Sequence, residues 1–271
     1  MKSDKLKRGL FKRFDALALV LPLSLVAAWC LASYVIMLPS YLLPRPDQVV
    51  MGLLDFVIGK WRLSPYSGRF VTHSLASLSR VIQGFLIALT AGLSLGIWSG
   101  SVTRAKRVLD PFVDLLRMVP GIGWLPIAMV WFGVGHVSAV FLIALASFFP
   151  IYINTALGVR IIPLNLIQAA RSLGATGPSL FFHVIIPAAS PGILSGMRLG
   201  LGISWAYVVL GELTGVNEGL GAVMMNARML GDTNMILVCM IVIALLGRLT
   251  DRLLVLLSKA IHIGGGVRSN D

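Results

Sequence analysis

The sequence predicts an all-α, polytopic integral membrane protein with about six transmembrane helices. Of its 271 residues, 57% are hydrophobic and only 13% are charged, whereas soluble globular domains carry about 25% charged residues. The hydrophobic residues also gather in long runs, and crossing a bilayer requires about 20 consecutive apolar residues. A soluble fold of this size would have too little polar surface to cover itself, so the membrane span is the unit of organisation.

The first span follows a basic N-terminal tail, residues 1–15. From Ala16 to Pro44 the chain has no charge, and this run exceeds the apolar core of a signal peptide, which is about 7–15 residues long. We therefore expect an uncleaved first helix. The next segment, 39–72, is rich in proline, and its apolar stretch 49–58 predicts an amphipathic helix at the membrane surface.

The middle of the chain predicts three spans. Residues 81–103 are uncharged and form the second span. Residues 118–159 carry no formal charge and are about twice as long as one span, so they must hold two helices. The glycine-containing stretch 133–136 is the natural turn between them. These helices are expected at 112–132 and 137–159.

The last two spans are expected at 189–213 and 234–257, which places both termini on the same side. Basic residues gather on that side, and the positive-inside rule makes it the cytoplasm. They are the basic residues of the tail, Arg104, Lys106, Arg107, Arg160, Arg171, Arg252, Lys259 and Arg268. This distribution explains the net charge of +12, and without a binding motif it does not indicate nucleic acid. Segment 39–72 would then be periplasmic.

Two rows of small residues recur every four positions. One contains Gly84, Gly92 and Gly96, and the other contains Gly192, Gly196 and Gly200. Residues four apart share a helix face, and small side chains let helices approach closely in lipid. We interpret both rows as helix-packing surfaces rather than as a transport path.

The segment 160–191 is too polar to span a membrane and too regularly patterned for a simple loop. It is bounded by Pro163 and Pro187, and its apolar residues between 164 and 173 recur at helical spacing. Gly174 would end a first short helix, and Pro178 would lie in the first turn of a second. The pattern predicts a helix–turn–helix at the cytoplasmic membrane surface.

This segment resembles the EAA loop of ABC importer permeases. Ala169-Ala170 is followed by Gly174 and, after nine intervening residues, by Val184-Ile185-Ile186-Pro187. In that family the loop forms a coupling helix that docks onto the ATP-binding subunit. The usual Glu of the first position is Gln168 here, which keeps a hydrogen-bond acceptor but loses the charge. The resemblance implies that 160–188 is the coupling loop and that it acts through Gln168, Ala169, Ala170, Gly174 and Pro187.

The resemblance covers nearly the whole chain. Stretches such as LLPRPDQVV, LDPFVDLLRMVPGIGWLPIAMVWFG and GELTGVNEGLGAVMMNAR are similar to permeases for sulfonates, taurine and nitrate. This implies a single permease domain, 1–271, with the type I ABC importer fold in the bacterial inner membrane. It also implies a homodimer that works with a cognate ATP-binding subunit and a periplasmic or lipid-anchored solute-binding protein. The chain has no Gly-x-x-x-x-Gly-Lys-Ser/Thr motif, so ATP and magnesium would be bound by the partner.

Three residues of the fifth span are candidates for a translocation path: Arg198, Trp205 and Glu212. Ionisable groups inside membrane spans are costly and usually functional or paired, so a purely structural pairing is the alternative for Arg198 and Glu212. At helical spacing, Asp114 is expected to pair with Arg117, and Arg248 with Asp251. The histidines are scattered, and we expect neither a metal site nor a catalytic residue.

The sequence is compatible with several transported solutes. A sulfonate, taurine or a similar oxyanion is favoured, and nitrate, bicarbonate or a vitamin precursor are alternatives within the same family. An ion-coupled secondary transporter is the alternative of another class. It would need repeated halves, discontinuous helices and carboxylates near the midplane, and the sequence shows no repeat. A membrane enzyme would need a nucleophile and base, and none is evident.

Overall fold

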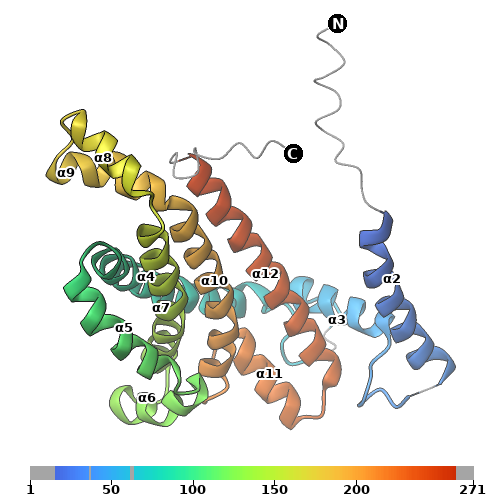
Figure 1. Cartoon of the computed structure of the whole chain (residues 1–271). Coiled ribbons are helices and arrows are strands. Elements are labelled where there is room, and N and C mark those ends of the chain that lie inside the picture. The colour runs from blue at the N-terminus through green and yellow to red at the C-terminus, as the bar shows by residue number, and fades with distance from the viewer. Residues whose placement is uncertain (1–15, 37, 62–63, 261–271) are drawn as a thin grey trace, which may run out of the picture.

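The computed structural model describes residues 16–36, 38–61 and 64–260, and this part of the chain is helical without strands. The expected tail 1–15 lies outside it. Within this described part, four long helices are apolar enough to cross a membrane (Figure 1). They are α4 (Phe70–Ser101), α7 (His136–Arg160), α10 (Ile186–Glu212) and α12 (Thr233–Ala260).

Helix α7 is the centre of the bundle, because both α4 and α10 pack along it. A side chain could not replace the glycines at these contacts: a Cβ at Gly84 would lie 2.6 Å from Ile143 Cβ, and one at Gly192 would lie 2.8 Å from Gly158 Cα. Gly92, Gly96, Gly196 and Gly200 also face α7 at similarly short distances. Both glycine rows therefore lie where two helices approach closely.

The third expected span is not one continuous helix, so that prediction was wrong. Helix α5 (Thr103–Arg117) ends well before α6 (Leu125–Phe132), and a short 3₁₀ turn, η2 (Gly121–Trp124), separates them with a bend of 90°. Pro120 supplies no backbone N–H and disfavours helix in the residue before it. The predicted turn at 133–136 is confirmed, since α6 ends at Phe132 and α7 begins at His136.

Residues 16–36, 38–61 and 64–260 therefore contain four candidate spans, or five if the bent pair α5–α6 counts as one, whereas the sequence predicted about six. A shorter apolar helix, Val20–Val35, belongs to the first expected span. It comprises α2 (Ala16–Cys30) from Val20 onward and a π-helical turn, η1 (Leu31–Val35). In Figure 1 it stands apart from the other long helices.

Helix α3 (Pro46–Ile58) confirms the helix expected in segment 39–72. Its inner face buries Val49 and Phe56, and it packs on α12. Hydrogen bonds join α3 and the residues just before it to the first expected span: Trp29 Nε1 donates to the Pro44 carbonyl at 2.9 Å, and the Tyr34 hydroxyl donates to Asp47 Oδ1 at 2.6 Å. The Tyr34 bond lowers the pKa of Asp47.

The expected helix–turn–helix is present, but its second helix runs on into the next span. Helix α8 (Leu164–Ser172) is followed by α9 (Gly177–Leu180), a π-helical turn, η3 (Phe181–Ile185), and directly by α10. The chain thus continues helically through Pro187, because proline lacks an N–H and is tolerated in the first turn of a helix, where that N–H would have no partner within the helix. We call α8–α9 the hairpin, and its end of the molecule the hairpin end.

The opposite end of the molecule contains α11 (Leu220–Met229), which bridges α10 and α12. Helix α10 runs from the hairpin to this α11 end, and α7 runs in the reverse direction (Figure 1). Charged clusters at these two ends, the hairpin, and a cavity at the α5–α6 bend are the features that bear on function.

Candidate functional site

The hairpin projects from the helix bundle (Figure 1) and exposes apolar side chains. Helix α8 has no buried residue, and the exposed fractions are 74% for Leu164 and 89% for Leu173. Its base is anchored by Ile162 and Ile167, which pack with Ile193 of α10. The coupling-loop candidates Gln168, Ala169, Gly174 and Pro187 are exposed, and Ala170 is half-buried. Such a surface suits docking of another protein.

Gly174 sets the shape of the hairpin, and the helix end predicted there is confirmed. Its φ is +87°, a left-handed conformation that other residues adopt at a cost. The Gly174 N–H donates to the Arg171 carbonyl at 2.9 Å, and the Ala175 N–H donates to the Ala170 carbonyl at 3.0 Å. These two bonds form a Schellman motif, which satisfies carbonyls at the end of α8.

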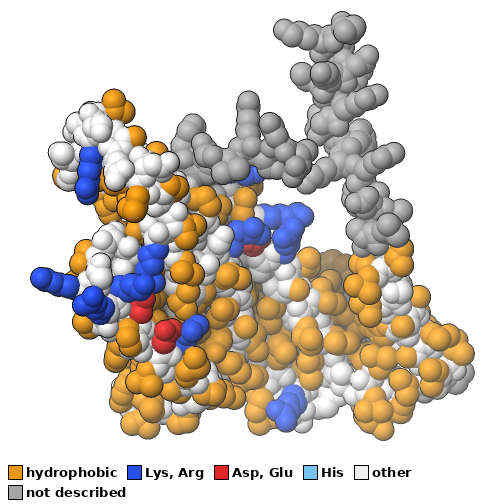
Figure 2. Space-filling model, in the orientation of Figure 1, with side chains coloured by type: hydrophobic (Ala, Val, Ile, Leu, Met, Phe, Trp, Pro, Cys, Tyr) orange, Lys and Arg blue, Asp and Glu red, His pale blue; other side chains and the backbone are white. Residues whose placement is uncertain are grey.

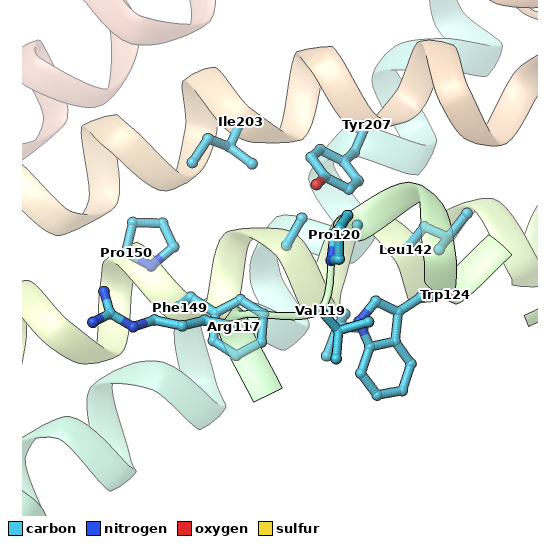
Figure 3. Close-up of a pocket in the computed structure, with 12 residues that line it drawn as sticks. Arg117, Val119, Pro120, Trp124, Leu142, Phe149, Pro150, Ile203 and Tyr207 are labelled. Carbon is cyan, nitrogen blue, oxygen red and sulfur yellow. The ribbon is translucent and has the colours of Figure 1, made fainter. Parts of the chain in front are cut away.

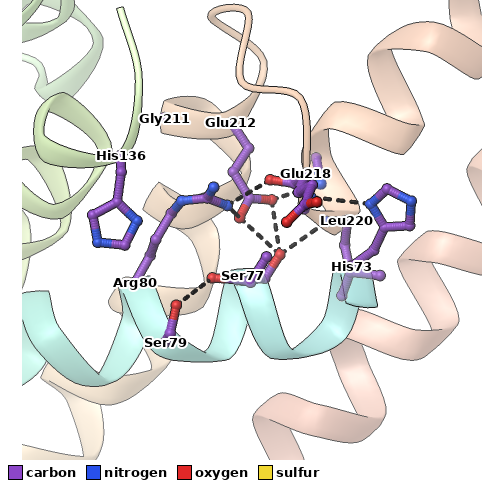
Figure 4. Close-up of polar contacts among 12 residues, drawn as sticks. His73, Ser77, Ser79, Arg80, His136, Gly211, Glu212, Glu218 and Leu220 are labelled. Atoms are coloured by element: carbon purple, nitrogen blue, oxygen red, sulfur yellow. Dashed lines mark hydrogen bonds and ion pairs between the residues drawn. The ribbon is translucent and has the colours of Figure 1, made fainter. Parts of the chain in front are cut away.

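A buried charged cluster lies at the α11 end (Figure 4). Arg80 of α4 pairs with Glu212 of α10 at 2.6 Å, and their side chains are 8% and 0% exposed. The Ser77 hydroxyl donates to both Glu212 oxygens, at 2.7 and 2.9 Å. The Gly221 N–H donates to Glu212 Oε2 at 2.8 Å. The Arg80 charge and these hydrogen bonds together offset the free-energy cost of removing the Glu212 carboxylate from water.

The same cluster fixes the backbone at the start of α11. Arg80 donates to the Glu218 carbonyl at 2.7 Å, the Gly219 N–H donates to His73 Nδ1 at 3.2 Å, and the Leu220 N–H donates to Ser77 Oγ at 2.9 Å. Gly219 has φ +139°, and a Cβ there would overlap the Glu212 carboxylate. Each of four consecutive residues, 218–221, is thus held by a side chain of α4 or α10.

Sequence reasoning missed the partner of Glu212. A signal was present, because His73, Ser77 and Arg80 are spaced i, i+4 and i+7 and therefore share one face of α4. The prediction that Glu212 lines a path is not tested by this arrangement, but a fully buried, fully bonded carboxylate favours the structural alternative.

The other two path candidates lie together in a groove between α10 and α12, of about 530 Å³. Arg198 donates to the two carboxylate oxygens of Asp251, at 2.8 and 3.0 Å. Trp205 is 4% exposed and donates from Nε1 to Thr250 at 3.0 Å. The expected contact of Asp251 with Arg248 is confirmed at 3.4 Å. Both candidates therefore have partners within this chain.

A second charged cluster lies at the hairpin end, near the start of the hairpin. Arg160 pairs with Asp110 at 2.8 Å and also donates to Ser99 Oγ at 2.6 Å. The Tyr152 hydroxyl donates to Asp110 at 2.7 Å. This cluster joins α4, α5 and α7 at the point from which the chain enters α8. It is half-buried, with both side chains of the ion pair about one quarter exposed.

Basic side chains gather toward the hairpin end. On the face shown in Figure 2, Lys and Arg lie over α5 and near the upper parts of α10 and α12, whereas hydrophobic side chains cover most of the remainder. Among the described residues these cations include Arg104, Lys106, Arg107, Arg248 and Arg252. The expected pair of Arg117 and Asp114 on α5 is confirmed at 2.9 Å.

Comparisons with known proteins agree with this architecture. Residues 71–263 match the family described as binding-protein-dependent transport system inner membrane component. A putative ABC transporter permease protein of Methanocaldococcus jannaschii is 38% identical, with 91% of this chain and 92% of that protein covered. A putative aliphatic sulfonates transport permease protein of Escherichia coli is 40% identical, with 85% of each covered.

A solved structure gives the fold independently. The chain is similar to a chain of the inward-facing MetNI methionine ABC transporter, with a TM-score of 0.56 and 20% identity. The match covers 66% of this chain and 92% of that one. The helical arrangement is therefore the type I permease fold expected from the sequence.

Proposed function

The chain belongs to the family of binding-protein-dependent transport system inner membrane components, and we propose that it carries a small organic sulfonate or similar oxyanion across the bacterial inner membrane. It is a membrane-spanning permease subunit of an ABC importer. The sulfonate assignment is supported by the 40% identity to a relative named for aliphatic sulfonates. Nitrate, bicarbonate or a vitamin precursor are the alternative cargoes.

The partners follow from the exposed hairpin, which is the observation that carries the proposal. We propose that the hairpin is the coupling element and docks onto a separate ATP-binding subunit that binds ATP and magnesium. Exposed apolar residues such as Leu173, at 89% exposure, would be covered by that contact. A solute-binding protein would deliver the cargo at the α11 end, and two copies of the chain would form the pathway.

The orientation follows from charge. If the hairpin meets the ATP-binding subunit, the hairpin end is cytoplasmic, and the basic residues gathered there obey the positive-inside rule. The N-terminal end of α2 and the C-terminal end of α12 point the same way in Figure 1. We therefore propose that both termini are inside and that segment 39–72 is periplasmic.

The broken helix α5–α6 is a feature that we associated with an ion-coupled secondary transporter. Family membership favours the ATP-driven mechanism, and an experiment separates the two. The chain is reconstituted in liposomes with its ATP-binding subunit and binding protein, and ethanesulfonate uptake is measured. We expect ATP-dependent uptake and ATP hydrolysis stimulated by the binding protein. Uptake by the chain alone, driven by a proton or sodium gradient, would contradict the proposal.

The coupling role of the hairpin has a matched pair of variants. Gly231, at the α11 end, ends α11 with the same Schellman bonds, a φ of +70° and open space around its Cα, as Gly174 does for α8. Valine at either position forces a left-handed conformation costing about 1–2 kcal/mol. We expect Gly174→Val to weaken binding of the purified ATP-binding subunit at least about tenfold and Gly231→Val to leave it unchanged, since a 1.4 kcal/mol loss is tenfold.

Equal binding by the two variants would show that the hairpin is not the docking element. Thermal unfolding of both variants in detergent checks that their stabilities fall by similar amounts. The variants would then differ in the location of the strain and not in its size.

A further inference from the structure

A cavity of about 360 Å³ lies beside the bend between α5 and α6 (Figure 3). Its walls come from the bend, from α7 and from α10, and they are mostly apolar, with Leu142, Phe149 and Ile203 among the lining residues. Its volume falls within the range of small-molecule sites, about 300–1,000 Å³. The cavity lies on the face of α10 that carries Ile203 and Tyr207, whereas Arg198 and Trp205 line the groove toward α12.

The side-chain polar groups of this cavity are chiefly hydrogen-bond donors. Arg117 and Trp124 have no acceptor atom, and Tyr207 contributes a hydroxyl. Trp124 Nε1 is buried and has no hydrogen-bond partner among the described residues. No Asp or Glu is among the lining residues. A buried N–H without an acceptor is costly, so it indicates a polar group that joins it in another state.

The bend places these donors around one space. Tyr207 can pack against the bend only because residue 121 is glycine, since a Cβ at Gly121 would overlap the Tyr207 hydroxyl. In Figure 3 the ring of Tyr207 points from α10 toward Pro120 and the bend, with Trp124 beyond it and Arg117 along the α7 wall.

The charge of Arg117 is only loosely balanced within the chain. Its Nε lies 2.9 Å from Asp114 Oδ1, and the two side chains are 43% and 54% exposed. The nearby Asp110 is already paired with Arg160. By contrast, Arg198 on the opposite face of α10 bonds both oxygens of Asp251. Arg117 is therefore the better placed arginine for an added anion.

We propose that this cavity binds the anionic group of the transported solute during its passage, with Arg117, the Trp124 N–H and the Tyr207 hydroxyl as the contacting groups. The ligand class is a small organic anion with a sulfonate or comparable oxyanion group. Its role in passage rests on the proposed function, whereas the anion preference of the cavity is independent of it.

The anion preference is tested first on the full chain in membranes. Ile203→Cys is made in a background in which Cys30 and Cys239 are serine, and its thiol is labelled with two methanethiosulfonate reagents of similar size. One reagent ends in a sulfonate and the other in trimethylammonium. We expect Arg117→Gln to lower the sulfonate-to-ammonium rate ratio about tenfold, since Arg117 and the labelled position line the same cavity and the charge acts there in a partly desolvated site. Arg117→Lys should keep the ratio.

Ala206→Cys, on the face of α10 toward α12, is the matched control and should show no dependence on Arg117. An unchanged ratio at Ile203→Cys in the Arg117→Gln variant would overturn the proposal. Ala146→Cys probes the opposite wall on α7. If neither cavity thiol reacted with either reagent, the cavity would be closed to solutes, and the proposal would also be wrong.

Passage is tested in the complete reconstituted transporter with ethanesulfonate. Arg117→Gln should reduce uptake at least about tenfold while ATP hydrolysis stimulated by the binding protein stays within about twofold of wild type, and Arg117→Lys should restore most of the uptake. Normal uptake by Arg117→Gln would overturn the role of the cavity and leave importer function intact. Absence of ATP-driven uptake by the wild-type complex would instead contradict the proposed function.

Discussion

The charged clusters at the two ends of the bundle are built differently. At the α11 end, Arg80 and Glu212 are almost fully buried and hold the backbone of residues 218–221. At the hairpin end, Arg160 and Asp110 are half-buried and are held mainly by other side chains. A cluster that bonds backbone fixes one conformation of a turn. A cluster of side chains from three helices can be rearranged by small helix shifts, which suits the end where we place coupling.

The largest expected effect comes from breaking the buried pair. Glu212→Ala would leave the Arg80 charge and the Gly221 N–H without their acceptor inside the protein. We expect the free energy of unfolding to fall by about 3–5 kcal/mol. Thermal unfolding in detergent measures this loss.

Glu218→Ala is the control for that variant, because Glu218 accepts the Arg80 hydrogen bond through its backbone carbonyl oxygen and that oxygen is retained. Equal stability of Glu212→Ala and Glu218→Ala would mean that the Glu212 carboxylate does not hold this end together.

A smaller loss is expected at the hairpin end. Asp110→Asn keeps an oxygen that accepts from Ser99 and Tyr152 but removes the charge that faces Arg160. Because this pair is half-buried, its loss should cost about 1–3 kcal/mol, between the values for exposed and buried pairs. The same unfolding assay measures it. A loss as large as that of Glu212→Ala would remove the contrast between the two ends.

The smallest effect is expected at the exposed pair of α5. Asp114 and Arg117 have side chains 54% and 43% exposed, so Asp114→Asn should change the free energy of unfolding by less than about 1 kcal/mol. This variant is the reference for Asp110→Asn, because it removes the same charge from the same helix, one turn later, at an exposed position. If Asp114→Asn lowered the free energy of unfolding more than Asp110→Asn does, burial would not determine how much each of the three ion pairs contributes to stability.

Periodicity and composition were sufficient for most of the helices. The turn at 133–136, the helix in 39–72, the end of α8 at Gly174 and the local pairs of Asp114 with Arg117 and Arg248 with Asp251 could all be predicted. Each depends on residues close together in the chain, whose spacing decides what they contact. The glycine rows likewise showed where helices approach, although not which helix lies opposite.

Predictions from the sequence were wrong where the effect of a proline depended on the tertiary contacts of its helix. The expected span 112–132 was long enough to cross a membrane, but Pro120 divides it. Packing of α5 on α4 and of α6 on α7 decides the 90° bend. Pro187 gave the opposite error, since it was interpreted as a boundary although the helix continues through it. A proline limits the local hydrogen bonds, and the tertiary contacts decide whether the helix bends or continues.

The sequence by itself determined a polytopic helical membrane protein with a helix–turn–helix segment like that of ABC importer permeases, because hydrophobic runs and short-range spacing are written along the chain. Only the tertiary structure decided that Glu212 is bound to Arg80, that Arg198 is bound to Asp251, and that Arg117, Trp124 and Tyr207 surround one cavity. These partners come from different helices, and their meeting depends on how the helices cross. That crossing is set by the packing of α4 and α10 on α7 and of α12 on α10, which local spacing does not encode.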